Sequence, residues 1–218
     1  IDQPQVALTF DDGPDPEVTP AVLDMLAEYD ARATFFVIGR HLEKHRALGE
    51  RIHREGHELG NHSWHHSYLL NFSWAAGHGV EMDRCSQLIK SVIQSDREPL
   101  YRPPVGLKSP AMARAAHKRH LNVVAWSIHS RDTFARNPGA VANGVARRIR
   151  PGDIVLMHDG HDRDNQHRPL ILEALPLLLQ ALRERELKSV TVSELSNDTQ
   201  PATPAPNGAT LAADDARS

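Results

Sequence analysis

The chain has 218 residues, of which 40% are apolar and 24% are charged, a composition typical of one globular domain with a sizeable core. Its net charge of -3 gives no reason to expect a nucleic acid or an anionic membrane as partner. The single cysteine, Cys85, excludes an internal disulfide, and no apolar run approaches the roughly 20 residues of a membrane-spanning helix. The fourteen histidines are unusual, and they direct attention to metal binding and proton transfer.

Short apolar runs alternate with helical patterns along the chain. The pattern predicts strands at residues 6–10, 33–38, 58–60, 100–102, 121–126, 153–157 and 189–192. It predicts helices at residues 19–29, 41–55, 75–94, 109–119, 139–150 and 168–186, the last of them despite Pro176. Thr19 and Ser109 each precede a proline, so we expect them to be the N-caps of their helices.

This alternation predicts an α/β fold with a parallel sheet. About seven strand–helix units in a chain of this length favour a closed or nearly closed, distorted (β/α) barrel, and an open doubly wound sheet is the alternative. Residues 1–196 form the expected folded domain. Residues 197–218 offer almost nothing to bury, and we expect them to be a disordered tail or a linker.

Polar clusters follow the ends of five predicted strands. They lie at residues 9–15, 61–66, 101–106, 126–132 and 156–160. In a parallel barrel the carboxyl ends of the strands face one mouth, where active sites form. We therefore expect these clusters to contribute to a single site.

His62 and His66 are four residues apart, so on one helical turn both imidazoles would share a face. Two histidines and one carboxylate are a common ligand set for a hydrolytic metal, and Asp11 or Asp12 can supply the carboxylate. Because adjacent residues that leave a strand point in different directions, one aspartate can bind the metal while the other acts as a base. A solvated surface turn is the alternative interpretation of the histidine pair.

The order and spacing of the polar clusters resemble the motifs of one family. These motifs correspond to TFDDGPD at 9–15, HSWHH at 62–66, RPPVG at 102–106, WSIHSRD at 126–132 and LMHD at 156–159. The chain resembles the NodB-homology polysaccharide deacetylases, carbohydrate esterase family four, from about Val6 to Leu195. The resemblance implies a distorted barrel with fewer than eight complete units, and it makes residues 1–196 a deacetylase catalytic domain.

The resemblance also implies how the first motifs divide the chemistry. Asp12, His62 and His66 would bind the metal, for which zinc is the default and cobalt, nickel or manganese are alternatives. Asp11 would be the base that takes a proton from the attacking water. Arg102 would orient Asp11 and pair with its charge.

The later motifs would complete the site. His158 would be the general acid that protonates the leaving amine, and Asp132 would pair with it and raise its pKa. The backbone N–H of Val105 would help to hold the oxyanion. Leu156 would line the pocket for the acetyl methyl group, and Trp126 would belong to the same substrate-contacting set.

The chain departs from the family pattern at three positions. Val105 stands where the family often has an aromatic residue, His129 where an aspartate is expected, and Thr133 where a tryptophan is expected. Asp132 is retained, so the tuning of the acid is expected to persist. These changes alter the substrate wall more than the chemistry.

We therefore predict a metal-dependent hydrolase of linear amides that removes N-acetyl, or O-acetyl, groups from an amino sugar polymer or oligosaccharide. The alternatives are a hydrolase of small cyclic amides or imides on the same fold and a non-catalytic carbohydrate-binding relative. The full metal triad argues against the first, and the presence of Asp11 and His158 argues against the second. Chitin oligomers, peptidoglycan, exopolysaccharide and acetylated xylan all stay open as substrates.

The expected partner is thus an acetylated glycan, and we expect a monomer that acts outside the cytoplasm, although no signal peptide is visible. Other histidines have simpler interpretations. His41, His45, His53 and His57 lie on or near a polar helix, and we expect them to be surface residues.

Overall fold

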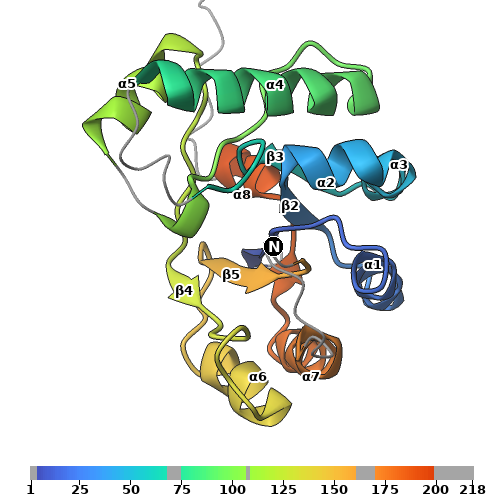
Figure 1. Ribbon diagram of the computed structural model, residues 1–218. Helices are drawn as coiled ribbons and strands as arrows, with labels where there is room; N and C mark the ends of the chain where they lie inside the picture. Colours follow the sequence, from blue (N-terminus) through green and yellow to red (C-terminus); the bar gives the residue numbers. More distant parts are fainter. Residues whose placement is uncertain (1–3, 68–74, 107–108, 161–169, 199–218) are drawn as a thin grey trace, which may run out of the picture.

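The computed structural model describes residues 4–67, 75–106, 109–160 and 170–198, with helices arranged around a central group of strands (Figure 1). The strands are β1 (Gln5–Asp11), β2 (Ala33–Val37), β3 (Glu58–Asn61), β4 (Ile128–His129), β5 (Ile154–His158) and β6 (Lys188–Ser189). The helices are α1 (Thr19–Glu28), α2 (Gly39–Lys44), α3 (Arg46–Arg54), α4 (Ala75–Ile93), α5 (Pro110–Lys118), α6 (Pro138–Ala146), α7 (Ile171–Glu184) and α8 (Val192–Asp198). Within these described residues, no helix has both the length and the apolar content needed to cross a membrane.

The strand pairs among the described residues are all parallel. Their order is β3-β2-β1-β5-β4, and β6 pairs with the first residues of β1. Beyond β3, single bridges join Asn61 to Tyr101 and Tyr101 to Val123. Since Val123 lies shortly before β4, the pairings return to β5 and close a ring. The predicted α/β fold with a distorted barrel is confirmed.

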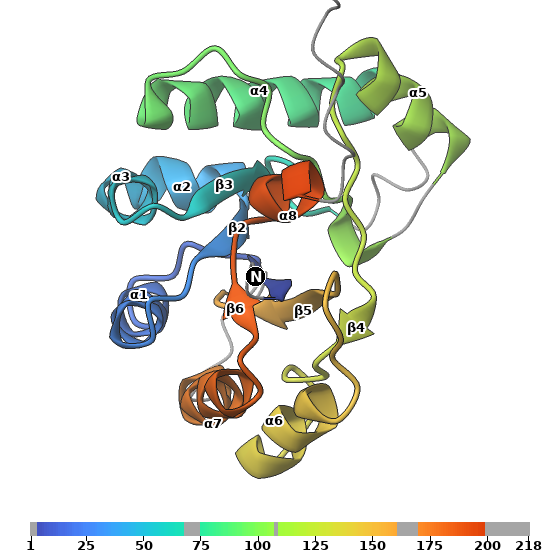
Figure 2. The same cartoon turned by 180° about the vertical axis from the view of Figure 1, so that it is seen from behind.

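Strand β1 lies between two cores. Its even-numbered residues are completely buried in the main core, which the sheet forms with α1, α2, α3, α4, α6 and α7. Ala7 belongs instead to a second cluster with Val190, Val192 and Leu195. This cluster brings α8 against the amino ends of the strands (Figure 2). Because strand side chains alternate, Asp11 lies on the same face of β1 as Ala7, but at the opposite, carboxyl end.

Most predicted elements are present with shifted ends. Ser109 caps α5 as predicted, because its Oγ accepts the N–H of Met112 at 3.1 Å. The predicted cap at Thr19 is wrong, since Val18 holds that position and Thr19 is the first helical residue. The Thr19 hydroxyl instead donates to the buried carboxylate of Asp159 at 2.6 Å.

Three predicted elements are interrupted. The helix expected at 41–55 is divided into α2 and α3 at His45, whose φ of -120° and ψ of 44° are not helical. The strand expected at 100–102 is reduced to bridges at Tyr101, and the strand expected at 121–126 to one bridge at Val123. Val123 is exposed, so this segment lacks the buried face that would hold it in a continuous ladder.

Helix α8 replaces the end of the last predicted strand. The N–H of Thr191 donates to Glu194 Oε2 at 2.9 Å, and the N–H of Glu194 donates to Thr191 Oγ1 at 3.2 Å. This reciprocal capping box begins a helix at Val192, which was expected to be in a strand. The helix continues to Asp198, past the predicted boundary at 196, and residues 199–218 of the predicted tail lie outside the described residues.

The close approach of β3 to β2 gives a test of the packing beneath the site. A Cβ at Gly60 would lie 2.5 Å from Cδ1 of Phe36, so the ring would have to shift. We predict that Gly60→Ala lowers the free energy of unfolding by about 1–3 kcal/mol. Urea unfolding followed by circular dichroism measures this change.

Gly144→Ala in α6 is the matched control, because a Cβ there would meet nothing within 4 Å. We expect this control to raise the free energy of unfolding by about 0.4–1 kcal/mol. Equal unfolding midpoints for the two variants would contradict the prediction.

Candidate active site

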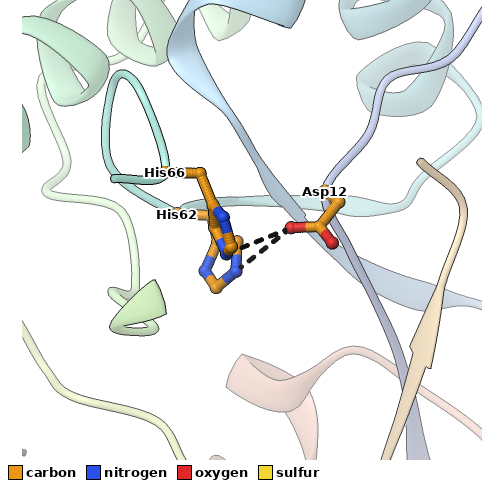
Figure 3. Close-up of side chains that lie close together, drawn as sticks. All are labelled: Asp12, His62 and His66. Atoms are coloured by element: carbon orange, nitrogen blue, oxygen red, sulfur yellow. Dashed lines mark ion pairs between the residues drawn. The ribbon is translucent and has the colours of Figure 1, made fainter. Parts of the chain in front are cut away.

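Asp12, His62 and His66 bring three possible metal ligands together beyond the carboxyl ends of β1 and β3 (Figure 3). Asp12 Oδ1 lies 3.5 Å from His62 Nε2 and 3.4 Å from His66 Nε2. The three ligand atoms lie within 4.8 Å of one another, and both histidines are buried. In Figure 3 both rings face the same carboxylate oxygen, as expected for donors that converge on one ion.

The Nδ1 atom of His62 fixes the orientation of its ring. Nδ1 lies 2.8 Å from the backbone carbonyl oxygen of Arg102, which can only accept, so Nδ1 carries the proton and Nε2 offers its lone pair. Burial is the largest influence on the ring and lowers the pKa of His62 to about 4. The ring is therefore neutral at neutral pH, as a metal ligand must be, and the three residues fit a divalent ion such as zinc.

The loops that carry these ligands have unusual backbone geometry. We call residues 11–15 the aspartate loop and residues 61–66 the histidine loop. Asp12, Ser63 and His66 have φ values of 74°, 68° and 55°, in the left-handed region. The N–H of His66 donates to Ser63 Oγ at 3.1 Å. The predicted helical turn between the two histidines is therefore wrong, because left-handed residues bring their rings together instead.

Arg102 is completely buried and holds Asp11. Its Nη1 donates to Asp11 Oδ1 at 2.8 Å and to Thr9 Oγ1 at 2.7 Å. The guanidinium carbon lies 4.0 Å from the centroid of the Phe36 ring. Asp11 Oδ2 lies 3.6 Å from His62 Nε2, so one carboxylate oxygen is held by Arg102 while the other faces the ligand cluster. This geometry suits a base beside a metal site.

His158 and Asp132 form a second ion pair at the end of β5. His158 Nδ1 donates to Asp132 Oδ1 at 3.0 Å, and the backbone N–H of His158 donates to Asp132 Oδ2 at 2.8 Å. Burial opposes the charge of the imidazole, but the hydrogen bond and charge of Asp132, with the charges of Asp11 and Asp12, outweigh it and raise the pKa of His158 to about 9. His158 is thus charged at neutral pH and able to give a proton.

The remaining predicted substrate residues come from different segments of the chain. Leu156 is buried in β5 and is the register partner of Thr9 in β1. Val105 is exposed in the short 3₁₀ segment Pro104–Gly106 and has a φ of 51°. The ring of Trp126 occupies the place where a Cβ of Gly106 would lie, so it packs beside the Val105 segment.

Two histidines expected at the surface have inward contacts, which corrects that expectation. His57 is buried, and its Nδ1 accepts the N–H of Ala33 at 3.2 Å. His41 is partly buried, and its Nδ1–H donates to the backbone carbonyl oxygen of Asp12 at 2.8 Å. His53 is exposed as expected. The polar helical pattern gives no signal for the inward contacts, because their partners come from distant segments.

Asp159 is a further site residue that sequence reasoning missed. Its buried carboxylate accepts the hydroxyl of Thr19 and occupies the place where a Cβ of Gly13 would lie. Burial, together with the charges of Asp11 and Asp15, raises the pKa of Asp159 to about 7 although the Thr19 hydrogen bond lowers it. Asp159 thus packs under the aspartate loop, and its place directly after His158 in the LMHD motif was the signal that pointed to it.

Known proteins are similar to this chain over most of its length. A family model described as polysaccharide deacetylase matches residues 2–124. A peptidoglycan-N-acetylglucosamine deacetylase of Bacillus cereus is 39% identical over 193 residues, which cover 87% of this chain and 87% of that protein. A chitooligosaccharide deacetylase of a Bradyrhizobium species is 36% identical over 187 residues, which cover 83% of this chain and 85% of that protein.

A solved structure agrees with these relatives. Peptidoglycan deacetylase PdaC from Bacillus subtilis superposes with a TM-score of 0.78 at 30% identity, covering 90% of this chain and 93% of that chain. The family model matches more than half of the sequence, and each of these relatives is named a deacetylase. The predicted enzyme class is therefore confirmed, and the chain belongs to the polysaccharide deacetylase family.

Proposed function

We propose that this enzyme hydrolyses the N-acetyl group of N-acetylglucosamine residues in peptidoglycan or in a chitin-type oligosaccharide, with a divalent metal that is zinc by default. The observation that carries the proposal is the register pairing of Asp11 with His158 on adjacent strands, beside the Asp12, His62 and His66 cluster. The names of the relatives support these glycans. A peptidoglycan substrate would place the enzyme outside the cytoplasm, and we propose that location.

The residues divide the work of amide hydrolysis. A metal at the three-ligand site would lower the pKa of water and polarise the acetyl carbonyl. Asp11, held by Arg102, takes a proton from the attacking water. The backbone N–H of Val105 donates to the developing oxyanion. His158 then gives a proton to the leaving amine, while Asp132 stabilises the imidazolium until the transfer.

The charge state of His158 favours an N-acetyl over an O-acetyl substrate. An amine is a poor leaving group unless it receives a proton, whereas an alkoxide depends less on this help. The pKa of about 9 keeps the imidazole protonated across the neutral range. On the substrate side, Leu156 contacts the acetyl methyl group and Trp126 contacts the sugar.

Acetate release tests the proposed function directly. Chelator-treated protein is incubated with chitooligosaccharides and with peptidoglycan fragments, with and without added zinc. We expect no acetate from the treated protein and recovery of acetate release when zinc returns. Stoichiometric zinc binding without acetate release from any acetylated glycan would contradict the proposed substrate class, and failure to bind zinc would contradict the proposed metal dependence.

Adjacent aspartates allow a matched test of their separate roles. We predict that Asp11→Asn lowers kcat by roughly 10²–10⁴-fold, because the variant loses the base but keeps an oxygen for Arg102. Its zinc affinity, measured by titration calorimetry, should stay close to that of the wild type. Asp12→Asn should instead weaken zinc binding, because the amide is a poorer ligand than the carboxylate. The role of Asp11 as base is wrong if Asp11→Asn retains wild-type turnover.

The pH dependence of kcat/KM tests the pairing of His158 with Asp132. We expect the activity of the wild type to fall as pH rises through about 9, where His158 loses its proton. Asp132→Asn removes the charge that opposes the effect of burial, so the alkaline limb should move to lower pH. Asp24→Asn, an exposed carboxylate on α1, is the control and should leave the limb unchanged.

The raised pKa of His158 also contributes to folding stability. Its stabilising effect is fully present below the ordinary histidine pKa of about 6.5 and is lost as pH rises through the folded-state value of about 9. The free energy of unfolding of Asp132→Asn should therefore depend less on pH across this window.

The kinetic experiment has its own contradicting outcome. If the alkaline limb of the kcat/KM profile does not move in Asp132→Asn, the assignment of His158 as the acid is wrong.

A further inference from the structure

The first turn of helix α2 contacts both loops that carry the proposed metal ligands. The N–H groups of residues 38–40 donate, in chain order, to the carbonyl oxygens of Gly13 at 3.0 Å, Ser63 at 2.9 Å and Trp64 at 3.2 Å. Gly13 belongs to the aspartate loop, and the other two residues belong to the histidine loop. The first amides of a helix have no partner within the helix, so they are available for such contacts.

His41 adds a side-chain contact to this set. Its Nδ1 lies 2.8 Å from the backbone carbonyl oxygen of Asp12. A carbonyl oxygen only accepts, so the ring must place its proton on Nδ1. The contact therefore depends on a donor attached to Cγ of residue 41, and its partner is the backbone of a proposed metal ligand.

Asp12 needs such support because of its backbone conformation. Its φ of 74° lies in the left-handed region, which a residue other than glycine adopts at a cost and keeps only where its surroundings hold it. The carbonyl group that His41 binds belongs to this strained residue. If the carbonyl were released, the chain could relax toward a common conformation, and the carboxylate would then move away from His62 and His66.

We propose that His41 is a positioning residue that fixes the backbone of Asp12 and thereby raises the affinity of the site for a divalent metal. The inference rests on the metal-dependent function proposed above. His41 acts through Asp12 and not by contact with the metal or the substrate. The contacts of residues 38–40 come from backbone N–H groups, so they do not depend on the side chains of these residues. The contact from residue 41 does depend on its side chain.

The test compares two substitutions of nearly the same shape. Asn keeps an N–H donor on Cγ, in the position of the histidine Nδ1, whereas Leu places a methyl group there. We expect His41→Leu to weaken zinc affinity by roughly tenfold, as is typical when a partner of a ligand is lost, and His41→Asn to stay close to the wild type. Competition with a chromophoric chelator measures the affinity of each full-length protein. His53→Leu, at an exposed position on α3, is the control and should bind zinc as the wild type does.

Two further measurements separate positioning from a general effect on folding. Excess zinc should restore the acetate release of His41→Leu, because the variant lacks affinity and not a catalytic group. Thermal unfolding of the metal-free proteins shows whether the variants are folded. If His41→Leu does not fold, His41→Ala is compared with His41→Asn in its place.

The outcomes distinguish the inference from the function on which it rests. Equal zinc affinities for wild type, His41→Asn and His41→Leu would overturn the role of His41 and leave the metal site intact. Equal losses in His41→Asn and His41→Leu would also overturn it, because the donor would then be irrelevant. A wild-type protein that binds no zinc would overturn the proposed metal dependence, and the inference with it.

Discussion

The arrangement of the site depends on the contacts of the buried guanidinium group of Arg102. A charge inside a protein is tolerated only where it is paired and hydrogen-bonded, and Arg102 meets this need with Asp11 and Thr9 on β1. Its backbone carbonyl oxygen also accepts the ring N–H of His62. One residue therefore orients the proposed base and sets the tautomer of a proposed ligand. The charge is fixed where β1, the histidine loop and the chain after Tyr101 meet.

The adjacent aspartates Asp11 and Asp12 differ in backbone conformation, which fits the different roles proposed for them. Asp11 ends an extended strand, whereas Asp12 has a left-handed φ of 74°, so the two carboxylates approach the histidines from different directions. Asp11 has an oxygen 3.6 Å from His62 Nε2, but its other oxygen is held by Arg102. Asp12 contacts His62 and also lies 3.4 Å from His66 Nε2. This geometry supports the proposal that Asp12, between both imidazoles, is the metal ligand and that Asp11, held beside them, is the base.

The fold could be predicted where apolar runs are buried on a continuous surface. This holds for β1 and β2, and for α7, which continues through Pro176 as its pattern predicted. The prediction was wrong where a local hydrogen-bonding motif competed with residue preference. The β-branched residues before Ser193 favour a strand, but the side chains of Thr191 and Glu194 cap a helix there. The Thr-Val-Ser-Glu spacing of that capping box was visible in the sequence and would have outweighed the strand preference.

The site shows a similar division between what sequence reasoning can and cannot find. The strand pattern could bring His62, His66 and one of the two aspartates together, because polar residues after parallel strands meet at one mouth of a barrel, and the family resemblance selected Asp12 as the ligand. The contact from His41 could not, because its partner is a backbone carbonyl group of a distant residue and carries no side-chain signal. Hydropathy describes residues 41–55 as one polar helix, although the break at His45 leaves a short α2 whose first turn faces the ligand loops. The amides that a helix leaves without internal partners must bind elsewhere, so the start of such a helix is where contacts to a neighbouring site are to be sought.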